Sequence, residues 1–447
     1  MTDNSFFGTE SIGKILIKIA PPVMLAQLIM ALYNIVDSFF VGRYSDDALT
    51  AVTVVYPMQI IIIALSVGTG VGVNIYMARK DALGEKDKAD GAAGTANVLA
   101  FLSWAVFAVL SFLLMRPYVM TSATGAGAIE QAVIYGNIVC VGSVGTFFEA
   151  SWSKIHQARG NMRRPMAAQV AGALTNVMLD PVLIFGLGPF PEMGIAGAAY
   201  ATVIGQAVSA VVTFPDAFFR VPEVKTMPHY IKKIYVYGYS SIAMEMLFTV
   251  YIFILNTILA TFSDSAVTVL GLYYKSQNFF FIPLIGLQTC IVPVISYNFA
   301  RKSYDRCRNI MRTSLFVSLV FMVIGIVLFV FFPETVMRVF SKSDEVIVIG
   351  KTAFPIIGLS FISAVFSLML PVFFQAIGRG MTCLLLMLTR QIFVLVPSFY
   401  LFSKIGLSYT WLAFPIAETT AGAVGLILYI KQLKAWRVLG KSTKAES

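Results

Sequence analysis

Residues 98–115 read VLAFLSWAVFAVLSFLLM, an apolar run without a charge, and SLFVSLVFMVIGIVLFVFF follows the same pattern at 314–332. Runs of this length span the ~30 Å hydrocarbon core of a bilayer as helices. The whole chain agrees, since 58% of its 447 residues are hydrophobic and only 13% are charged. Soluble globular chains carry about a quarter of charged residues. The sequence therefore predicts an all-α polytopic membrane protein.

Apolar segments of this kind recur along the chain, and several contain proline, which membrane helices tolerate at kinks. We expect twelve transmembrane helices arranged as two six-helix bundles. The predicted spans are 15–41, 51–78, 92–115, 131–153, 166–186, 194–219, 234–261, 267–299, 313–332, 352–377, 381–402 and 409–430.

Lysine and arginine are distributed very unevenly between the predicted loops. Of the 33 such residues, 25 fall in the two termini and in loops on one side, including 154–165, whereas six fall in loops on the other side. Cytoplasmic loops carry such an excess. We therefore expect both termini in the cytoplasm, and we interpret the net charge of +10 as a topology signal and not as nucleic-acid binding.

A shift of 218 residues partly overlays the chain on itself, so that HQARG at 156–160 meets FQAIG at 374–378. Because six is an even number of spans, both copies of the repeat enter the membrane from the same side. The copies are therefore parallel repeats, related by an axis normal to the membrane. The predicted domains are an N-lobe at 1–219, a cytoplasmic linker at 220–233 and a C-lobe at 234–447. Two bundles of this kind suit alternating access.

Carboxylates inside the predicted spans are the strongest functional signal, because a charge at bilayer depth is costly unless it faces a cavity or a partner. Asp37 has Tyr33 one helical turn earlier, and Asp180 has Asn176 at the same spacing, followed by Thr202 in the next span. The carboxylate, phenol, amide and hydroxyl oxygens of these residues suit Na⁺, or a proton shared by the two acids. A structural polar cluster is the alternative.

Other polar groups in the spans carry weaker signals. Glu245 is a single acid without an evident partner, and either Lys275 or Arg390 would neutralise an acid. GTGVG at 68–72 lies inside a span, without the Lys-Ser/Thr of a phosphate loop, and indicates helix packing. A membrane-embedded enzyme would need a nucleophile–base pair or a metal cluster, and the sequence contains neither pattern, so we predict no catalytic residue and no cofactor.

The stretch QARGNMRRPMAAQVAGALTNVMLDPVLIFG, together with MGIAGAAYATVIGQ, LYNIVDSFFVGR and FQAIGRG, resembles the signature of the multidrug and toxic compound extrusion (MATE) transporters, in their MepA-like bacterial branch. The resemblance covers essentially the whole chain. It implies a MATE/MOP-type fold and an antiporter that exchanges Na⁺ or H⁺ for organic, often cationic, drugs. It places the N-lobe cation site on Asp37, Asn176, Asp180 and Thr202, with Tyr33 beside them, and a possible C-lobe acid on Glu245.

Several expectations remain open at this point. The coupling ion is Na⁺, with Asp37, Asn176, Asp180 and Thr202 as its ligands, or H⁺, and a flippase or a dedicated metabolite exporter of the same superfamily is the alternative function. We expect a monomer in the plasma (inner) membrane of a prokaryote, with the lipid bilayer and small organic substrates as its partners. The candidate substrate-cavity residues are Gln27, Asn34, Phe281 and Gln375.

Overall fold

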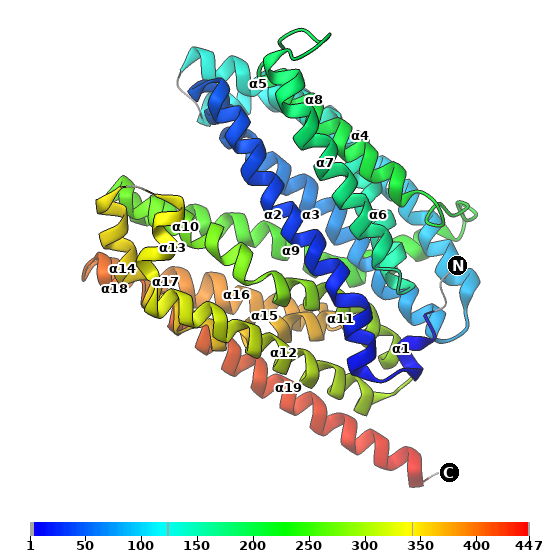
Figure 1. Cartoon of the computed structure of the whole chain (residues 1–447). Helices are drawn as coiled ribbons and strands as arrows, with labels where there is room; N and C mark the ends of the chain where they lie inside the picture. Colours follow the sequence, from blue (N-terminus) through cyan, green and yellow to red (C-terminus); the bar gives the residue numbers. More distant parts are fainter. Residues whose placement is uncertain (1–3, 123–124, 342, 446–447) are drawn as a thin grey trace. The chain divides into compact units, whose positions relative to one another are not determined.

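The computed structural model describes residues 4–122, 125–341 and 343–445, and these residues are almost entirely helical, with no β-strand among them. The all-α prediction is thus confirmed (Figure 1). Ten of the described helices are long and apolar enough to cross a membrane, and two bent helix pairs raise the number to as many as twelve if each pair is one span.

The described residues form two compact units. The N-terminal unit contains the segment ending at Thr9 and Ile17–Met246, and the C-terminal unit contains Glu10–Leu16 and the chain from Leu247 onward. The expected linker 220–233 is only partly a loop, because Met227 begins a long helix. That helix, α9 (Met227–Ala260), contributes its first half to the N-terminal unit.

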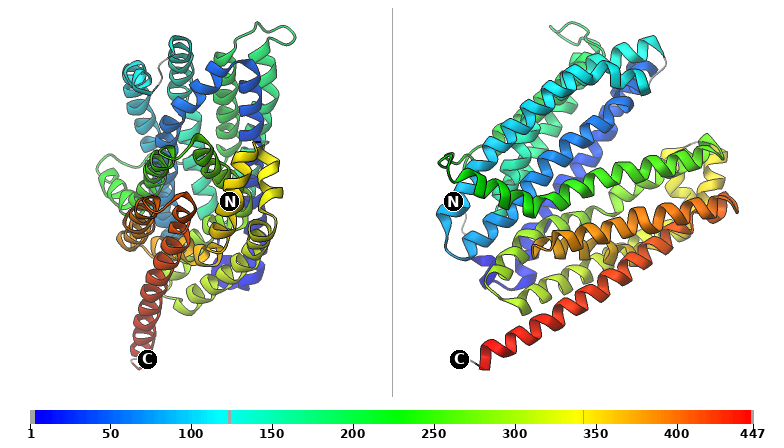
Figure 2. Two further views of the ribbon diagram at one scale, coloured as in Figure 1. Left: turned by 90° about the vertical axis from the view of Figure 1, so that its left-hand side faces the viewer. Right: turned by 180° about the vertical axis from the view of Figure 1, so that it is seen from behind.

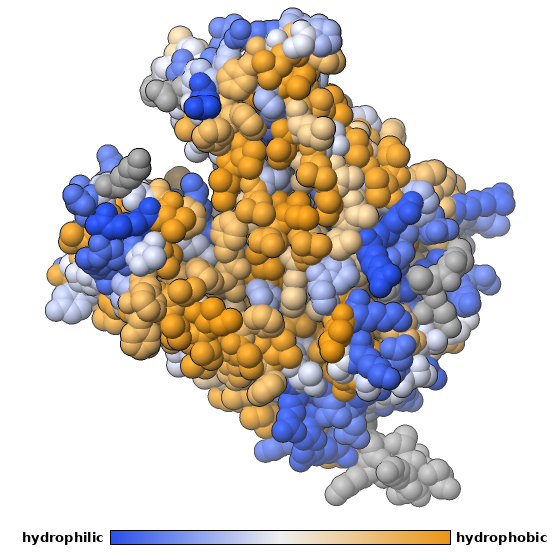
Figure 3. Space-filling model, viewed as in Figure 1, coloured by the Kyte–Doolittle hydropathy of each residue, from blue (hydrophilic) through white to orange (hydrophobic). Residues whose placement is uncertain are grey.

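The N-terminal unit is a bundle whose helices run alongside one another (Figure 2). Apolar side chains cover the middle of its helices, and hydrophilic ones gather at their ends (Figure 3). The helices α5 and α6 form a pair that is bent by 42° at the break between them. The bundle contains α1 (Phe6–Thr9), α2 (Ile12–Tyr44), α3 (Asp46–Ala82), α4 (Lys86–Ser122), α5 (Ala126–Val141), α6 (Val144–Ala158), α7 (Arg163–Phe185) and α8 (Ile195–Thr213).

The C-terminal unit repeats this plan, and its pair α14–α15 is bent by 57°. It contains a π-helix, η1 (Thr389–Leu395), between α16 (Gly380–Leu388) and α17 (Val396–Ser403). Its other helices are α10 (Asp264–Phe280), α11 (Ile282–Ala300), α12 (Tyr304–Phe331), α13 (Pro333–Phe340), α14 (Asp344–Gly358), α15 (Phe361–Ala376), α18 (Leu407–Thr410) and α19 (Ala413–Ala445).

The internal repeat is visible in the helix ends of the two units. Ser45 caps α3 by accepting a hydrogen bond from an amide three residues later, and Ser263 caps α10 in the same way. Gly160 and Gly378, which follow α6 and α15, both have φ of 78°. A positive φ favours glycine, so the matching HQARG and FQAIG stretches encode the same helix termination.

The GTGVG stretch of α3 packs against α9, as the sequence indicates. A β-carbon on Gly68 would lie 2.8 Å from the backbone nitrogen of Ile242, and one on Gly72 would lie 2.1 Å from the carbonyl oxygen of Ile234. On the facing helix, a β-carbon on Gly238 would lie 2.6 Å from the carbonyl oxygen of Gly68. The two backbones therefore approach as closely as small residues allow.

A buried ion pair joins η1 to α19 in the C-terminal unit. Arg390 donates to both carboxylate oxygens of Glu418, with Nε–Oε1 and Nε–Oε2 distances of 3.0 and 2.9 Å and an Nη2–Oε1 distance of 2.6 Å. Ser367 of α15 also donates to Glu418. Arg390 therefore neutralises Glu418 of its own unit, whereas Lys275 is exposed.

We predict that Gly72→Ala lowers the thermal stability of the purified protein in detergent, because its methyl group has no room against α9. Overpacking of this kind costs about 1–3 kcal/mol. Gly271→Ala in α10 is the matched control, since no atom lies within 4 Å of the added methyl group. Equal melting temperatures for the two variants would contradict the close packing of α3 on α9.

We also predict that Glu418→Leu is strongly destabilising, by about 3–5 kcal/mol, because it leaves the Arg390 charge buried without its partner. Arg390→Met combined with Glu418→Leu should recover most of the loss, since neither charge then remains. Thermal unfolding monitored by size-exclusion chromatography measures both effects. A double variant no more stable than Glu418→Leu alone would show that the pair does not account for the loss.

Candidate functional site

The site is built around two carboxyl groups from separate helices of the N-terminal unit. Asp37 lies seven residues before the end of α2, and Asp180 lies five residues before the end of α7, next to Pro181. Their carboxyl groups are within hydrogen-bonding reach of each other. Asp180 is fully buried, and Oδ1 of Asp37 has no hydrogen-bond donor among the described residues. Such a pair is stable only with a shared proton or a bound cation.

Asn176 connects this acid pair to α8. Its side-chain nitrogen lies 3.5 Å from Asp180 Oδ1 and 3.4 Å from Thr202 Oγ1. With the amide group turned over, the nitrogen donates to Asp180 Oδ2 at 3.3 Å and the oxygen accepts from the Thr202 backbone N–H at 3.2 Å. In both orientations Asn176 joins Asp180 to Thr202, so three of the predicted residues form one cluster with Asp37.

Two glycines bring α7 and α8 close enough for this contact. A β-carbon on Gly172 would lie 2.7 Å from the carbonyl oxygen of Gly205, and a β-carbon on Gly205 would lie 2.7 Å from that of Gly172. Asn176 is one turn beyond Gly172 and packs directly against Gly205, 3.3 Å from the position of such a carbon. The small residues of the two helices thus set the distance between Asn176 and Thr202.

Aromatic and amide groups complete the cluster. Tyr33, predicted from its spacing, lies close enough to Asp37 and Asp180 to interact with both electrostatically. Tyr135 of α5 is only 2% exposed, lies beside Asp37 and Thr202, and accepts a hydrogen bond from Gln59 at 3.2 Å. Nothing in the sequence points to Tyr135 or Gln59, because neither stands at a helical spacing from an acid.

Glu245 is not part of this cluster. It is half-buried in α9, and its electrostatic neighbours are Tyr56 of α3 and Lys154 of α6. The sequence-based loop 154–165 therefore begins too early, since Lys154 belongs to α6, which continues to Ala158. Glu245 does have a neighbour of opposite charge, contrary to the interpretation of this acid as isolated.

The four candidate substrate-cavity residues are not brought together within either unit. Gln27 is half-buried and Asn34 is exposed, both on α2. Phe281 and Gln375 lie in the core of the C-terminal unit, at 2% and 4% exposure, and Phe281 packs edge-on against Phe361. The sequence cannot distinguish an aromatic residue in a core from one that lines a cavity, since both lie in apolar runs.

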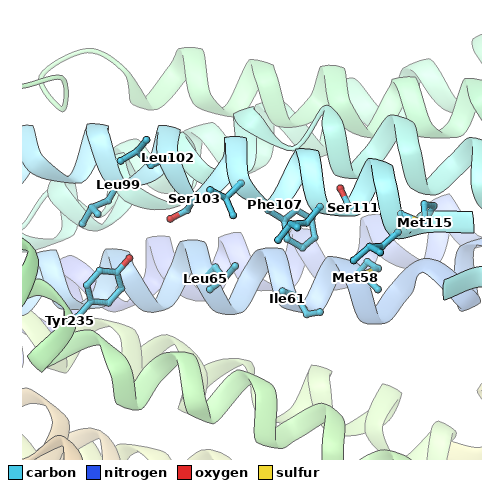
Figure 4. Close-up of a pocket in the computed structure, with 13 residues that line it drawn as sticks. Met58, Ile61, Leu65, Leu99, Leu102, Ser103, Phe107, Ser111, Met115 and Tyr235 are labelled. Atoms are coloured by element: carbon cyan, nitrogen blue, oxygen red, sulfur yellow. The ribbon is translucent and has the colours of Figure 1, made fainter. Parts of the chain in front are cut away.

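Two hollows in the N-terminal unit differ in chemistry. A groove of about 570 Å³ between α3 and α4 is lined almost wholly by apolar side chains, such as Leu65, Leu99 and Phe107, and Tyr235 lies at one end of it (Figure 4). A smaller cavity of about 190 Å³ reaches the acid cluster at Tyr33, Asn176 and Thr202. The polar chemistry therefore belongs to the smaller cavity.

The donor set of the cluster suits a small hard cation. Two carboxylates, an amide, a hydroxyl and a phenol supply only oxygen ligands to an ion, as Na⁺ prefers, and the same groups can hold a proton. Across the part of the chain that the structure describes, no three His, Cys, Asp or Glu side chains converge on one point. The cluster thus differs from transition-metal sites, which use such groups.

The chain matches a known protein family. The MatE family model matches it twice, at 22–182 and 241–401. The two matches together cover most of the chain, and their starting points differ by 219 residues, close to the predicted repeat of 218. The chain therefore contains two copies of the segment that the family model describes.

Similar proteins are found over nearly the full length of the chain. A FAD transporter of Shewanella oneidensis is 24% identical over 94% of this chain and 95% of its own. The probable multidrug resistance protein NorM of Thermotoga maritima is 27% identical over 78% of this chain and 76% of its own. The multidrug export protein MepA of Staphylococcus haemolyticus is 23% identical over 95% and 94%.

Solved structures share the fold. A multidrug resistance MATE transporter of the MOP superfamily in an outward-facing conformation aligns with a TM-score of 0.91 at 22% identity, covering 98% of this chain and 99% of its own. A MOP superfamily transporter from Pyrococcus furiosus aligns with a TM-score of 0.90. The predicted MATE/MOP-type fold is confirmed, and the chain belongs to the MatE family, whose members are multi-pass membrane transporters and not enzymes.

Proposed function

We propose that this protein is an antiporter that exports organic, often cationic, compounds in exchange for H⁺ or Na⁺. The observation that carries the proposal is the close pair of Asp37 and Asp180, which Asn176 links to Thr202 within a membrane-spanning bundle. A buried acid pair binds a cation strongly when both acids are charged, and its negative charge falls by one unit when the cation is bound. We place the protein in a prokaryotic plasma membrane as a monomer, with both termini cytoplasmic.

Exchange then follows from competition between two conformational states. A cation entering from outside binds at Asp37 and Asp180, lowers their combined negative charge and favours the state in which the substrate binds weakly. Substrate bound from inside favours the state in which the pair is charged. Each ligand changes the affinity for the other by the same factor, because the coupling is a difference in binding free energies. A ligand with equal affinity for both states would not shift the equilibrium between them.

A dedicated metabolite exporter is the second candidate function. It is supported by the FAD transporter relative, which is 24% identical over nearly the whole chain. The described cavity of the N-terminal unit lies against the cluster that holds the Asp37 and Asp180 carboxyl groups, which attract cations and repel a diphosphate. This charge favours the export of cations over that of FAD or of a lipid-linked pyrophosphate.

We predict that Asp37→Asn and Asp180→Asn each reduce gradient-driven export by roughly tenfold or more, since neither variant can take up and release the cation. Ethidium, norfloxacin and FAD would be tested in proteoliposomes under an inward Na⁺ or H⁺ gradient. Asp264→Asn, at the exposed start of α10, is the matched control with the same chemical change. Export by both acid variants at the wild-type rate would exclude the acid pair from coupling.

We predict that Thr202→Val separates the two coupling ions. The hydroxyl oxygen is a potential Na⁺ ligand, whereas a proton shared between two carboxyl groups does not need it. In a Na⁺-coupled protein, Thr202→Val should raise the half-saturating Na⁺ concentration by about tenfold. In a H⁺-coupled protein, export driven by a pH gradient should stay near the wild-type rate. A variant that lost activity through unfolding would be recognised by size-exclusion chromatography.

A further inference from the structure

The cavity that reaches the acid cluster extends well beyond it. At one end it is lined by Tyr33, Asn176 and Thr202, and at the other by Glu149 of α6 and Gln169 of α7. Its volume of about 190 Å³ is far above that needed for one water molecule, ~10–15 Å³. The cavity therefore has room for several water molecules between Glu149 and the residues that flank the acid pair.

Polar atoms on the cavity wall require such water. Gln206 Oε1 of α8 and Thr146 Oγ1 of α6 are buried and have no hydrogen-bond partner among the described residues. An unsatisfied buried polar atom costs about 1–3 kcal/mol, so polar cavities of sufficient size are hydrated. Hydration of this cavity provides a route along which a proton or a small cation can move.

Glu149 lies nearer to the basic helix ends than the acid pair does. Asp180 is 17 residues from the start of α7 at Arg163, and Glu149 is nine residues from the end of α6 at Ala158. These two helix ends are joined by a short turn. At 1.5 Å per residue, Glu149 is therefore displaced by about 12 Å along the bundle.

The surroundings of Glu149 allow it to bind a cation without retaining it. Ser153 donates a hydrogen bond to Glu149 Oε1 at 2.5 Å, and the charge of Lys154 lies within electrostatic range. Lys154 itself donates to Gln157 at 3.1 Å and also acts on Glu245. From the other helices that line the cavity, α2, α3, α5, α7 and α8, the groups are apolar or uncharged polar side chains, such as Gln59, Gln169 and Ser209, together with the Tyr33 phenol.

We infer that Glu149 is a second cation station, which receives the coupling cation from the Asp37–Asp180 pair and passes it toward the basic helix ends. This inference rests on the proposed antiport. If the cation is a proton, it passes from the acid pair to cavity water by way of the hydroxyl group of Tyr33 or Thr202, both of which line the cavity, and water transfers a proton to the Glu149 carboxylate. If it is Na⁺, the Glu149 carboxylate replaces the pair as an oxygen ligand. The positive charge of Lys154 weakens binding at Glu149, so the cation can leave, as conduction through successive sites requires.

The test compares two reactions of Glu149→Gln in proteoliposomes. Substrate exchange without a cation gradient needs no cation release and should stay near the wild-type rate. Export driven by the Na⁺ or H⁺ gradient should fall by roughly tenfold or more, because release of the cation is blocked.

Glu130→Gln, on the exposed face of α5, is the matched control, and Glu149→Asp should restore much of the gradient-driven rate. Gln169→Leu, which removes a polar group from the cavity wall without changing a charge, should reproduce the defect if Glu149→Gln does not fold.

Two outcomes overturn the inference. One is gradient-driven export by Glu149→Gln at the wild-type rate, and the other is an equal loss of exchange and export that Glu149→Asp does not restore, since that indicates a structural role. Failure of the proposed function looks different. In that case wild-type export ignores both gradients, or Asp180→Asn exports normally, whatever the behaviour of the Glu149 variants.

Discussion

The contact between Gly172 and Gly205 controls the rest of the candidate site. It lets α7 and α8 approach until their backbones nearly touch, and this places Asn176 between Asp180 and Thr202. Without that approach Asp180, which is fully buried, would lose the polar groups that make burial of a carboxyl group tolerable in a membrane. Packing of residues without side chains thus determines the electrostatics of the site.

The equivalent helices of the C-terminal unit are held together by a different interaction. There the buried Arg390–Glu418 pair joins η1 to α19, where the N-terminal unit uses glycine packing and the Asn176 contacts. The pair is neutral overall and fully hydrogen-bonded through its guanidinium fork. The two units therefore have the same helix plan. In this pair of helices, however, Asp180 of the N-terminal unit is available to bind a cation, whereas Glu418 of the C-terminal unit is already paired with Arg390.

The features predicted well from the sequence are those set by one-dimensional patterns. Apolar runs defined the spans, the 218-residue shift revealed the repeat, and the spacing of Asn176 and Asp180 placed both on one face of a helix. The features missed depend on contacts between distant segments. Tyr135 and Gln59 meet the cluster only because α3 and α5 pack beside it, and Arg390 and Glu418 pair across two spans. A lysine near the end of an apolar run is typical of a loop, so the sequence cannot show that α6 continues past Lys154 to Ala158.

The packing of α3 on α9 has a consequence for the biogenesis of this protein. The face of α3 that carries Gly68 and Gly72 is covered by α9 residues 234–242, which lie beyond the end of the sixth span. Ribosomal synthesis of the first repeat alone therefore produces a bundle with one helix face uncovered in the lipid. The N-terminal unit can reach its final packing only after the first half of the seventh span has entered the membrane. A gene fragment cut at the repeat boundary would encode less than the unit that folds.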